Sequence, residues 1–227
     1  MENFFETREQ ASTAAADRMA DALSRRLDSQ PEASLIVSGG STPKACLEEL
    51  SSSPLDWQRT HVLLSDERWV PPDDPDSNEQ MIRRTLLQNR AAHADFLSVY
   101  DSSTDAATRC ETLDADIRAK PIPFSTALIG MGEDGHFASL FPDFDGLDAG
   151  LNVDSADLCL PVITAASPHP RITLTLAAIS RSDEIVLLIF GDAKRAVYEQ
   201  AKASPDAYPV SRLLLQKRAP VIVYWAP

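Results

Sequence analysis

Glycine is scarce in this chain of 227 residues, which contains only 8. That is about half the share of glycine in an average protein. Most of them fall in two short segments, a pair at positions 39 and 40 and a trio at 130, 132 and 135. Glycine is needed where the backbone adopts a positive φ or approaches a ligand closely. These two segments are therefore the first candidates for functional loops.

Cysteine and long apolar segments are rare as well. The 3 cysteines lie far apart without a CxxC pair, which argues against a disulfide framework and a cysteine-bound zinc. The 4 histidines show no HxxxH or HxH spacing, so we expect no metal. The longest wholly apolar run, Ile185–Phe190, is far short of the roughly 20 residues of a membrane helix, and the first ten residues lack the apolar core of a signal peptide. We expect a cytoplasmic protein without a membrane partner.

Positive charge is in deficit, because 21 Lys and Arg face 34 Asp and Glu and leave a net charge of −13. A chain this acidic repels the phosphates of nucleic acids, so nucleic acid is not an expected partner. Any small anionic ligand would need a local cluster of cations that overcomes the overall field. The hydrophobic fraction of 44% and the charged fraction of 24% are ordinary for a globular protein.

What the chain does contain is a regular alternation of apolar runs and helical patterns. Helices are expected over residues 8–28, 43–50 and 104–118 and from Ser77 and Asp192 onward, and strands over 34–38, 60–64, 96–100, 125–129, 158–163, 184–190 and 220–225. Residues 171–181 fit either a strand or a helix. Continuously apolar strands separated by helices indicate a mostly parallel sheet covered on both faces. Residues 1–227 are expected to form a single doubly wound α/β domain, in which ligands bind beyond the carboxyl ends of the strands.

The segment SGGSTPK, residues 38–44, links a predicted strand to a predicted helix. Gly39 and Gly40 let the backbone approach an anion, and the helix start adds free N–H groups. Ser41 and Thr42 offer hydroxyl donors. These features predict a phosphate cradle, and the alternative is a strand-to-helix turn with a Ser/Thr cap.

The segment GMGEDGHFASLFP, residues 130–142, follows another predicted strand. Its glycines match GxGxxG, but Glu133 and Asp134 would repel a pyrophosphate and Pro142 stops a following helix, so a dinucleotide site is not favoured. Histidine can accept a proton from water near neutral pH, which makes His136 a candidate base. Asp134 could orient its ring. The alternative is a structural histidine.

Charged side chains occur in two further places. In SDERWVP, residues 65–71, the charged residues Asp66 and Arg68 follow a buried-looking strand in a predicted loop. The planar guanidinium of Arg68 suits a carbonyl, carboxylate or phosphate, and the alternative is an internal ion pair with Asp66 or Glu67. Arg171 begins RITLTL, and Lys194 lies in the first turn of a predicted helix, where a cation opposes the helix dipole unless it binds an anion. An ordinary surface lysine is the alternative for Lys194.

These segments resemble the 6-phosphogluconolactonase family. SGGSTP, DERWVPPDDPDSN, GMGEDGHFASLFP, PRITLT and GDAK before a helix occur in the family's order over most of the chain. The family belongs to a larger group that includes the glucosamine-6-phosphate deaminases and resembles an open Rossmann-like α/β sheet. The resemblance implies hydrolysis of 6-phosphogluconolactone to 6-phosphogluconate in the oxidative pentose phosphate pathway, without a metal or nucleotide cofactor. We expect a monomer or a weak homodimer.

The resemblance also assigns roles to individual residues. Gly39, Gly40, Ser41 and Thr42 would form the phosphate loop, completed by Arg171 and Lys194, while Asp66 and Arg68 would line the lactone end. His136 would be the general base that activates water. Three residues depart from the family. Phe137 stands where a small hydroxyl residue is usual and would reshape the pocket beside His136, Asp143 stands where Gly is usual, and Glu79 replaces a more usual aromatic residue.

Three other functions compete with this interpretation. A glucosamine-6-phosphate deaminase carries DEY where this chain reads DER, and places a Glu after its histidine loop where this chain reads SLFPD. A sugar-phosphate sensor on the same fold would bind without turnover, which the presence of both His136 and Asp134 disfavours. An NAD-dependent oxidoreductase depends on the GxGxxG match alone.

Overall fold

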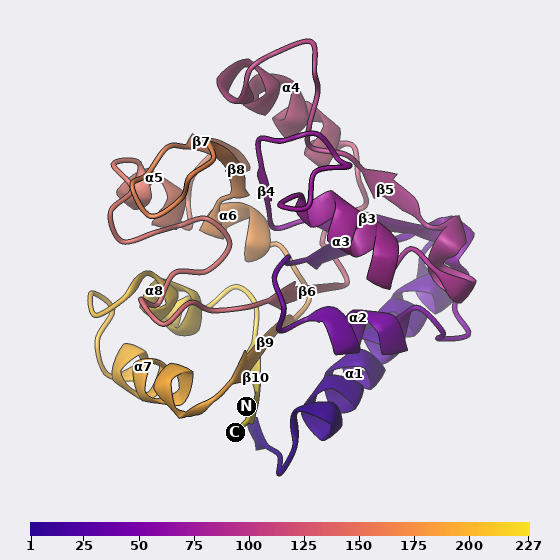
Figure 1. Cartoon of the computed structure of the whole chain (residues 1–227). Coiled ribbons are helices and arrows are strands. Elements are labelled where there is room, and N and C mark those ends of the chain that lie inside the picture. Colours follow the sequence, from indigo (N-terminus) through magenta and orange to yellow (C-terminus); the bar gives the residue numbers. More distant parts are fainter.

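Seven parallel strands form the central sheet of the computed structural model, which describes residues 1–227 (Figure 1). In sheet order they are β1 (Glu2–Phe4), β10 (Val221–Ala226), β9 (Ile185–Phe190), β6 (Thr126–Ile129), β2 (Ala33–Val37), β3 (Thr60–Leu64) and β5 (Asp95–Leu97). Every residue of β2 and β6 is buried, as strands covered on both faces require. The predicted parallel α/β sheet is confirmed. The edge strand β1 was not predicted, because three residues are too few to show a pattern.

Two groups of helices cover this sheet. The first contains α1 (Arg8–Ser29), α2 (Lys44–Leu50) and α3 (Asn78–Thr85), and the second contains α4 (Ala106–Arg118), α5 (Leu147–Leu151), α6 (Leu176–Ile179), α7 (Asp192–Ala203) and α8 (Pro209–Leu215). The strand order runs toward β5 in the first part of the chain and back toward β1 in the second. Because crossovers between parallel strands are right-handed, the two groups lie on opposite sides of the sheet, as α1–α3 and α6–α8 do in Figure 1. None of the helices has the length and hydropathy that a membrane crossing requires.

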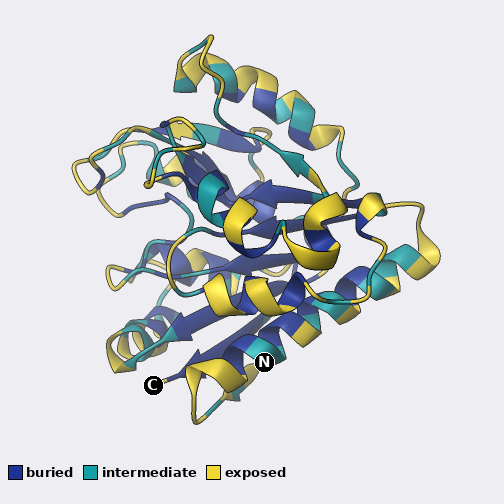
Figure 2. Ribbon diagram, turned by 45° about the vertical axis from the view of Figure 1, so that its right-hand side comes forward, coloured by how far each residue is buried: buried dark blue, intermediate teal, exposed yellow.

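The helices are amphipathic around a continuous core. Figure 2 shows buried strands between helices whose outer faces are exposed. The longest helix, α1, begins at a capping box between Thr7 and Gln10 and buries Ala15, Met19 and Leu23 on one face. Helical spacing of these apolar residues is what made this helix predictable.

A second, antiparallel sheet joins β4 (Asp66–Arg68), β8 (Arg171–Leu174) and β7 (Cys159–Val162). The prediction of a loop over residues 65–71 is therefore wrong at 66–68. These polar residues form a strand because they pair with β8. No apolar pattern in the sequence predicts this pairing. The ambiguous segment 171–181 divides into β8 and α6. The strand register places Arg68 directly opposite Arg171.

The order of the central strands explains where a site can form. β2 and β6 are neighbours, but the chain leaves β2 toward β3 on one side and leaves β6 toward β9 on the other. The loops that follow them therefore diverge and leave a crevice at the carboxyl edge of the sheet. Both glycine segments, 38–44 and 130–142, lie at this edge.

Candidate active site

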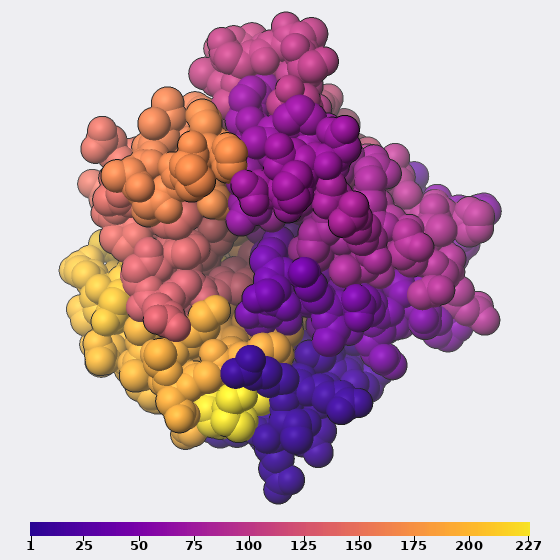
Figure 3. Space-filling view, viewed as in Figure 1, coloured from indigo at the N-terminus to yellow at the C-terminus, as the bar shows by residue number.

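A pocket of about 260 Å³ lies in this crevice. It is lined by Gly39, Gly40, Ser41, Thr42, Asp66, Arg68, His136, Arg171 and Lys194, which are all the site residues predicted from the sequence except Asp134. In Figure 3 a hollow opens at the centre of the face, where the purple surface of the N-terminal half meets the salmon and orange surface of the C-terminal half. The structure thus brings segments from both halves of the chain into one site.

The loop after β2 forms one wall of the pocket. Gly40 has a φ of +92°, a conformation that other residues rarely adopt. Gly39 is required for a different reason, since a Cβ there would lie 1.9 Å from Oδ1 of Asn78. The alternative of a Ser/Thr cap is wrong, because Pro43 is the N-cap residue of α2 and no side chain caps the helix. The hydroxyls of Ser41 and Thr42 are therefore available to a ligand.

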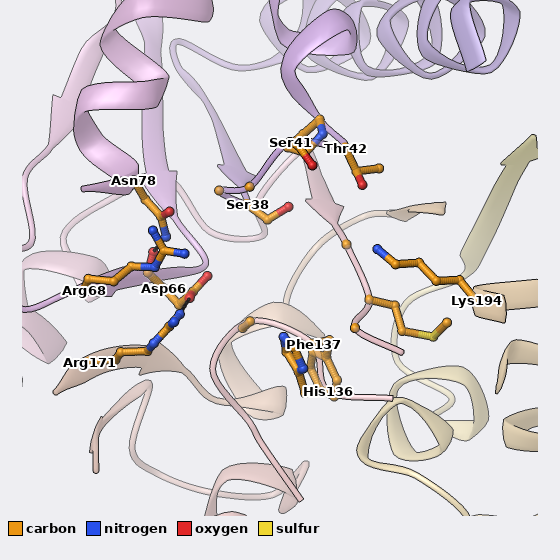
Figure 4. A pocket seen from close by; sticks show the side chains of 17 residues that line it. Ser38, Ser41, Thr42, Asp66, Arg68, Asn78, His136, Phe137, Arg171 and Lys194 are labelled. Atoms are coloured by element: carbon orange, nitrogen blue, oxygen red, sulfur yellow. Dashed lines mark hydrogen bonds and ion pairs between the residues drawn. The ribbon is translucent and has the colours of Figure 1, made fainter. Parts of the chain in front are cut away.

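His136 lies on the loop after β6, and Asp134 holds its ring. Nδ1 of the imidazole is 2.6 Å from Oδ1 of Asp134, and the ring centroid is 4.3 Å from that of Phe141. Because a carboxylate accepts hydrogen bonds, we assign the proton to Nδ1, which leaves Nε2 with a lone pair. In Figure 4, His136 faces the Ser41–Thr42 loop across the pocket.

The glycines of this loop make room for the histidine rather than for a dinucleotide. A Cβ on Gly132 would lie 2.3 Å from Nδ1 of His136. The next helix after the loop is α5, so the helix start that a GxGxxG motif requires does not follow the glycines. Phe137 borders the pocket but is fully buried in the hydrophobic core. Its bulk is therefore directed into the core rather than into the hollow.

Asp66, which is buried, and Arg171, whose side chain is 12% exposed, form an ion pair on another wall. Nη1 of Arg171 lies 3.4 Å from Oδ2 of Asp66, and its Nε donates to Ser167 at 2.8 Å. Asp66 also accepts hydrogen bonds from the hydroxyls of Ser139 at 2.6 Å and Ser65 at 2.9 Å. Burial lowers the pKa of the Arg171 guanidinium, and the negative charge of Asp66 opposes that shift. This network joins β4, β8 and the His136 loop.

Arg68 does not make the internal ion pair considered above. Its side chain donates to the backbone carbonyl of Asp76, and its Nε has no partner in the protein. Asp66 pairs with Arg171 instead, and the buried carboxylate of Glu67 accepts hydrogen bonds from backbone N–H groups at the start of α3, including that of Asn78 at 2.7 Å. Burial raises the pKa of Glu67, and these hydrogen bonds oppose the shift.

Lys194 approaches the pocket from the first turn of α7. Figure 4 shows it on the side opposite Arg68 and Arg171, with His136 between them. Burial lowers the pKa of Lys194, and the charge of Glu133 opposes the shift. Lys194 makes no ion pair in the protein. A partly desolvated cation without a partner is costly, and Lys194 lines the pocket with its ammonium group unpaired.

Sequence reasoning missed two polar residues that line the pocket. Asn78 is 3% exposed and begins α3, and Ser38 directly follows the apolar strand β2 and has a buried hydroxyl without a partner. The signal for Ser38 was its place between an apolar run and two glycines. Asn78 is the last residue of the segment DERWVPPDDPDSN that carries the family resemblance, but no local pattern gave it a role in the pocket. Residues 1–227 contain no cluster of three or more His, Cys, Asp or Glu side chains placed to hold a metal ion.

Comparisons with known proteins agree with one another. The sequence model of the family described as glucosamine-6-phosphate isomerases/6-phosphogluconolactonase matches residues 6–223. The 6-phosphogluconolactonases of Pseudomonas aeruginosa and Mesorhizobium japonicum are each 40% identical to this chain, over 96% and 99% of it and over 91% and 94% of their own lengths. The crystal structure of a 6-phosphogluconolactonase from Shewanella baltica superimposes with a TM-score of 0.96 at 36% identity, covering 100% of this chain and 97% of that one. A monomeric glucosamine-6-phosphate deaminase, 21% identical with a TM-score of 0.75 over 98% of this chain and 96% of its own, shares the fold.

Proposed function

Because this chain belongs to the family of glucosamine-6-phosphate isomerases and 6-phosphogluconolactonases, we propose that it hydrolyses 6-phosphogluconolactone to 6-phosphogluconate in the pentose phosphate pathway. One observation carries the proposal. A histidine held by a carboxylate shares its pocket with three cations and a loop with free hydroxyls, in a chain whose relatives at 40% identity are named 6-phosphogluconolactonases.

His136 is the general base in this proposal. While Asp134 engages Nδ1, Nε2 takes a proton from a water molecule whose oxygen adds to the carbonyl carbon of the lactone. The tetrahedral intermediate then breaks the bond between that carbon and the ring oxygen, and the ring oxygen takes the proton from the imidazolium. A δ-lactone is an activated ester, so the reaction needs no covalent nucleophile.

The other predicted residues bind and position the substrate. The Gly39–Thr42 loop and Lys194 bind the phosphate. Arg171, which the resemblance grouped with them, lies across the pocket beside Asp66 and Arg68 (Figure 4) and lines the lactone end with these two residues. Binding energy from the remote phosphate holds the carbonyl carbon near His136. The cations are necessary because the chain as a whole carries a charge of −13, which repels an anionic substrate.

The test is hydrolysis of 6-phosphogluconolactone, generated in situ and followed by pH-stat at neutral pH, with the spontaneous rate subtracted. The wild type is compared with His136→Ala and with His93→Ala, a matched control at an exposed histidine outside the pocket. Turnover by the wild type and His93→Ala, lost in a folded His136→Ala, is the expected result.

Other results separate the competing functions. Turnover that survives His136→Ala would keep the reaction and overturn the role of His136. A folded wild type that binds 6-phosphogluconate without hydrolysing the lactone would be a sensor. Release of ammonia from glucosamine 6-phosphate, without lactone hydrolysis, would make the protein a deaminase.

A further inference from the structure

We propose that Asn78 binds the substrate, and that its carboxamide oxygen accepts a hydrogen bond from a sugar hydroxyl and so selects polyhydroxylated phosphate esters. The proposal rests on the proposed function and names a residue that determines which ligand the same pocket takes. It is carried by the carboxamide oxygen of a buried residue that lines the pocket, an oxygen that has no partner in the protein.

Two hydrogen bonds fix Asn78 at the start of α3. Its backbone N–H donates to Oε1 of Glu67 at 2.7 Å, and its Nδ2 donates to the backbone carbonyl of Asp66 at 2.8 Å. The partner of the side chain is a carbonyl oxygen, so the amide nitrogen must face it. The orientation of the carboxamide is therefore determined, and Oδ1 points away from Asp66.

The oxygen of this carboxamide lies against the predicted phosphate loop. A Cβ on Gly39 would lie 1.9 Å from Oδ1 of Asn78, so only a glycine at that position leaves room for the amide. Oδ1 accepts no hydrogen bond in the protein. It is also not one of the side-chain atoms that are both fully buried and without a partner, so it is accessible to a ligand. Asn78 lines the pocket, and Figure 4 shows its amide beside the guanidinium of Arg68.

The other charged groups of the pocket do not supply a free acceptor for the hydroxyl groups of a sugar. Arg68, Arg171 and Lys194 are donors only, and they suit the charged and carbonyl groups of a ligand. The carboxylate of Asp66 already accepts three hydrogen bonds. The free hydroxyls of Ser38, Ser41 and Thr42 lie on the predicted phosphate loop, away from Asp66 and Arg68 (Figure 4). A sugar acid also carries hydroxyl hydrogens, and a sugar hydroxyl that finds no acceptor loses the hydrogen bonds it made to water. Asn78 offers a neutral acceptor to one of these hydroxyls.

The test compares two ligands that differ only in their hydroxyls. Binding of 6-phosphogluconate and of 6-(phosphonooxy)hexanoate, which has the same chain and charges without hydroxyls, is measured by calorimetry. The proteins are the wild type, Asn78→Ala and Ser77→Ala. Ser77 caps α3 and does not line the pocket, so its substitution loosens the same helix start while keeping the amide.

The preference for the hydroxylated ligand should fall roughly tenfold in Asn78→Ala, which corresponds to one hydrogen bond, and stay unchanged in Ser77→Ala. Binding of the hydroxyl-free ligand should be the same in all three proteins. If Asn78→Ala does not fold, Asn78→Leu, which keeps the branched shape of the side chain and has no acceptor, supplies the same comparison.

The inference is overturned if Asn78→Ala weakens both ligands equally, since Asn78 then only maintains the loop, or if the preference does not change. Lactone turnover together with an unchanged preference would retain the proposed function and reject this role of Asn78. A preference that depends on Asn78 in a protein without turnover would support this role of Asn78 and reject the proposed function. A wild type that binds neither ligand would reject both.

Discussion

The two sides of the pocket are built in opposite ways. On one side Asp66 is buried and Arg171 is largely covered, and they are hydrogen-bonded to each other and to serine hydroxyls. On the other side the His136 side chain is 27% exposed, and Lys194 makes no ion pair. Phe141 joins the sides, with its ring centroid 4.3 Å from that of His136 and 5.2 Å from the guanidinium carbon of Arg171. We call the side with Asp66 and Arg171 the engaged side, because its groups bind one another. We call the side with His136 and Lys194 the free side, because its groups are left to act on a ligand.

The largest effect on activity is expected on the free side. His136→Ala should lower kcat by roughly 10²–10⁴-fold, the usual contribution of a positioned base. The free energy of unfolding should change by less than about 1 kcal/mol, as is usual for a partly exposed side chain with few partners. Initial rates and urea denaturation measure the two quantities. A large loss of stability would show that His136 belongs to the scaffold and would erase the contrast between the sides.

The largest effect on stability is expected on the engaged side. Asp66→Ala leaves the largely covered guanidinium of Arg171 without a carboxylate, so the free energy of unfolding should fall by about 3 kcal/mol. Urea denaturation measures it against Asp76→Ala, which removes an exposed carboxylate paired with His169 and should cost less than about 1 kcal/mol. Equal losses in the two variants would contradict a buried network around Asp66.

Asp134→Asn sharpens the comparison, because Asp134 serves the free side but is 45% exposed. The amide no longer holds the proton on Nδ1 of His136, so kcat should fall about tenfold to hundredfold. That is less than the roughly 10⁴-fold seen where the orienting carboxylate is buried. Steady-state kinetics should show a change in kcat with little change in KM. Asp145→Asn, at an exposed position between the segment 130–142 and α5, should leave kcat unchanged, and an equal loss there would deny Asp134 a positioning role.

The free side was the more predictable from sequence. The loops after β2 and β6 follow apolar strands, and in a parallel sheet the carboxyl ends of neighbouring strands share one edge. Glycines at 39, 40, 130, 132 and 135 marked both loops, so the meeting of Ser41 and His136 could be predicted from pattern and topology alone.

The engaged side could not be predicted in the same way. β4 is three polar residues long, and its pairing with β8 is set by a distant partner rather than by a local pattern. Asp66 and Arg171 are far apart in sequence, so no local sequence pattern predicts their ion pair. Asn78 and the true reason for glycine at position 39 became visible only when α3 was packed against the loop after β2.

The smallest effects concern Lys194, where affinity and stability should move in opposite directions. Lys194→Met removes a cation that has no partner in the free protein, so KM for the phospholactone should rise roughly tenfold while stability at neutral pH increases. Lys217→Met, at an exposed lysine, is the matched control for both quantities and should change neither.

The pH dependence of the free energy of unfolding tests whether the partly buried charge of Lys194 lowers stability. Burial lowers the pKa of Lys194 below its ordinary 10.5, so between the folded and unfolded values the unfolded chain binds more protons than the folded one. Stability contributed by this group therefore rises with pH through that alkaline window, and the cost of burying the charge is fully present below it. Lys194→Met should abolish this rise, measured as unfolding free energy between about pH 7 and pH 10.5 relative to wild type. A variant that instead lost both affinity and stability would place Lys194 with Asp66 and Arg171, among the groups that hold the pocket together.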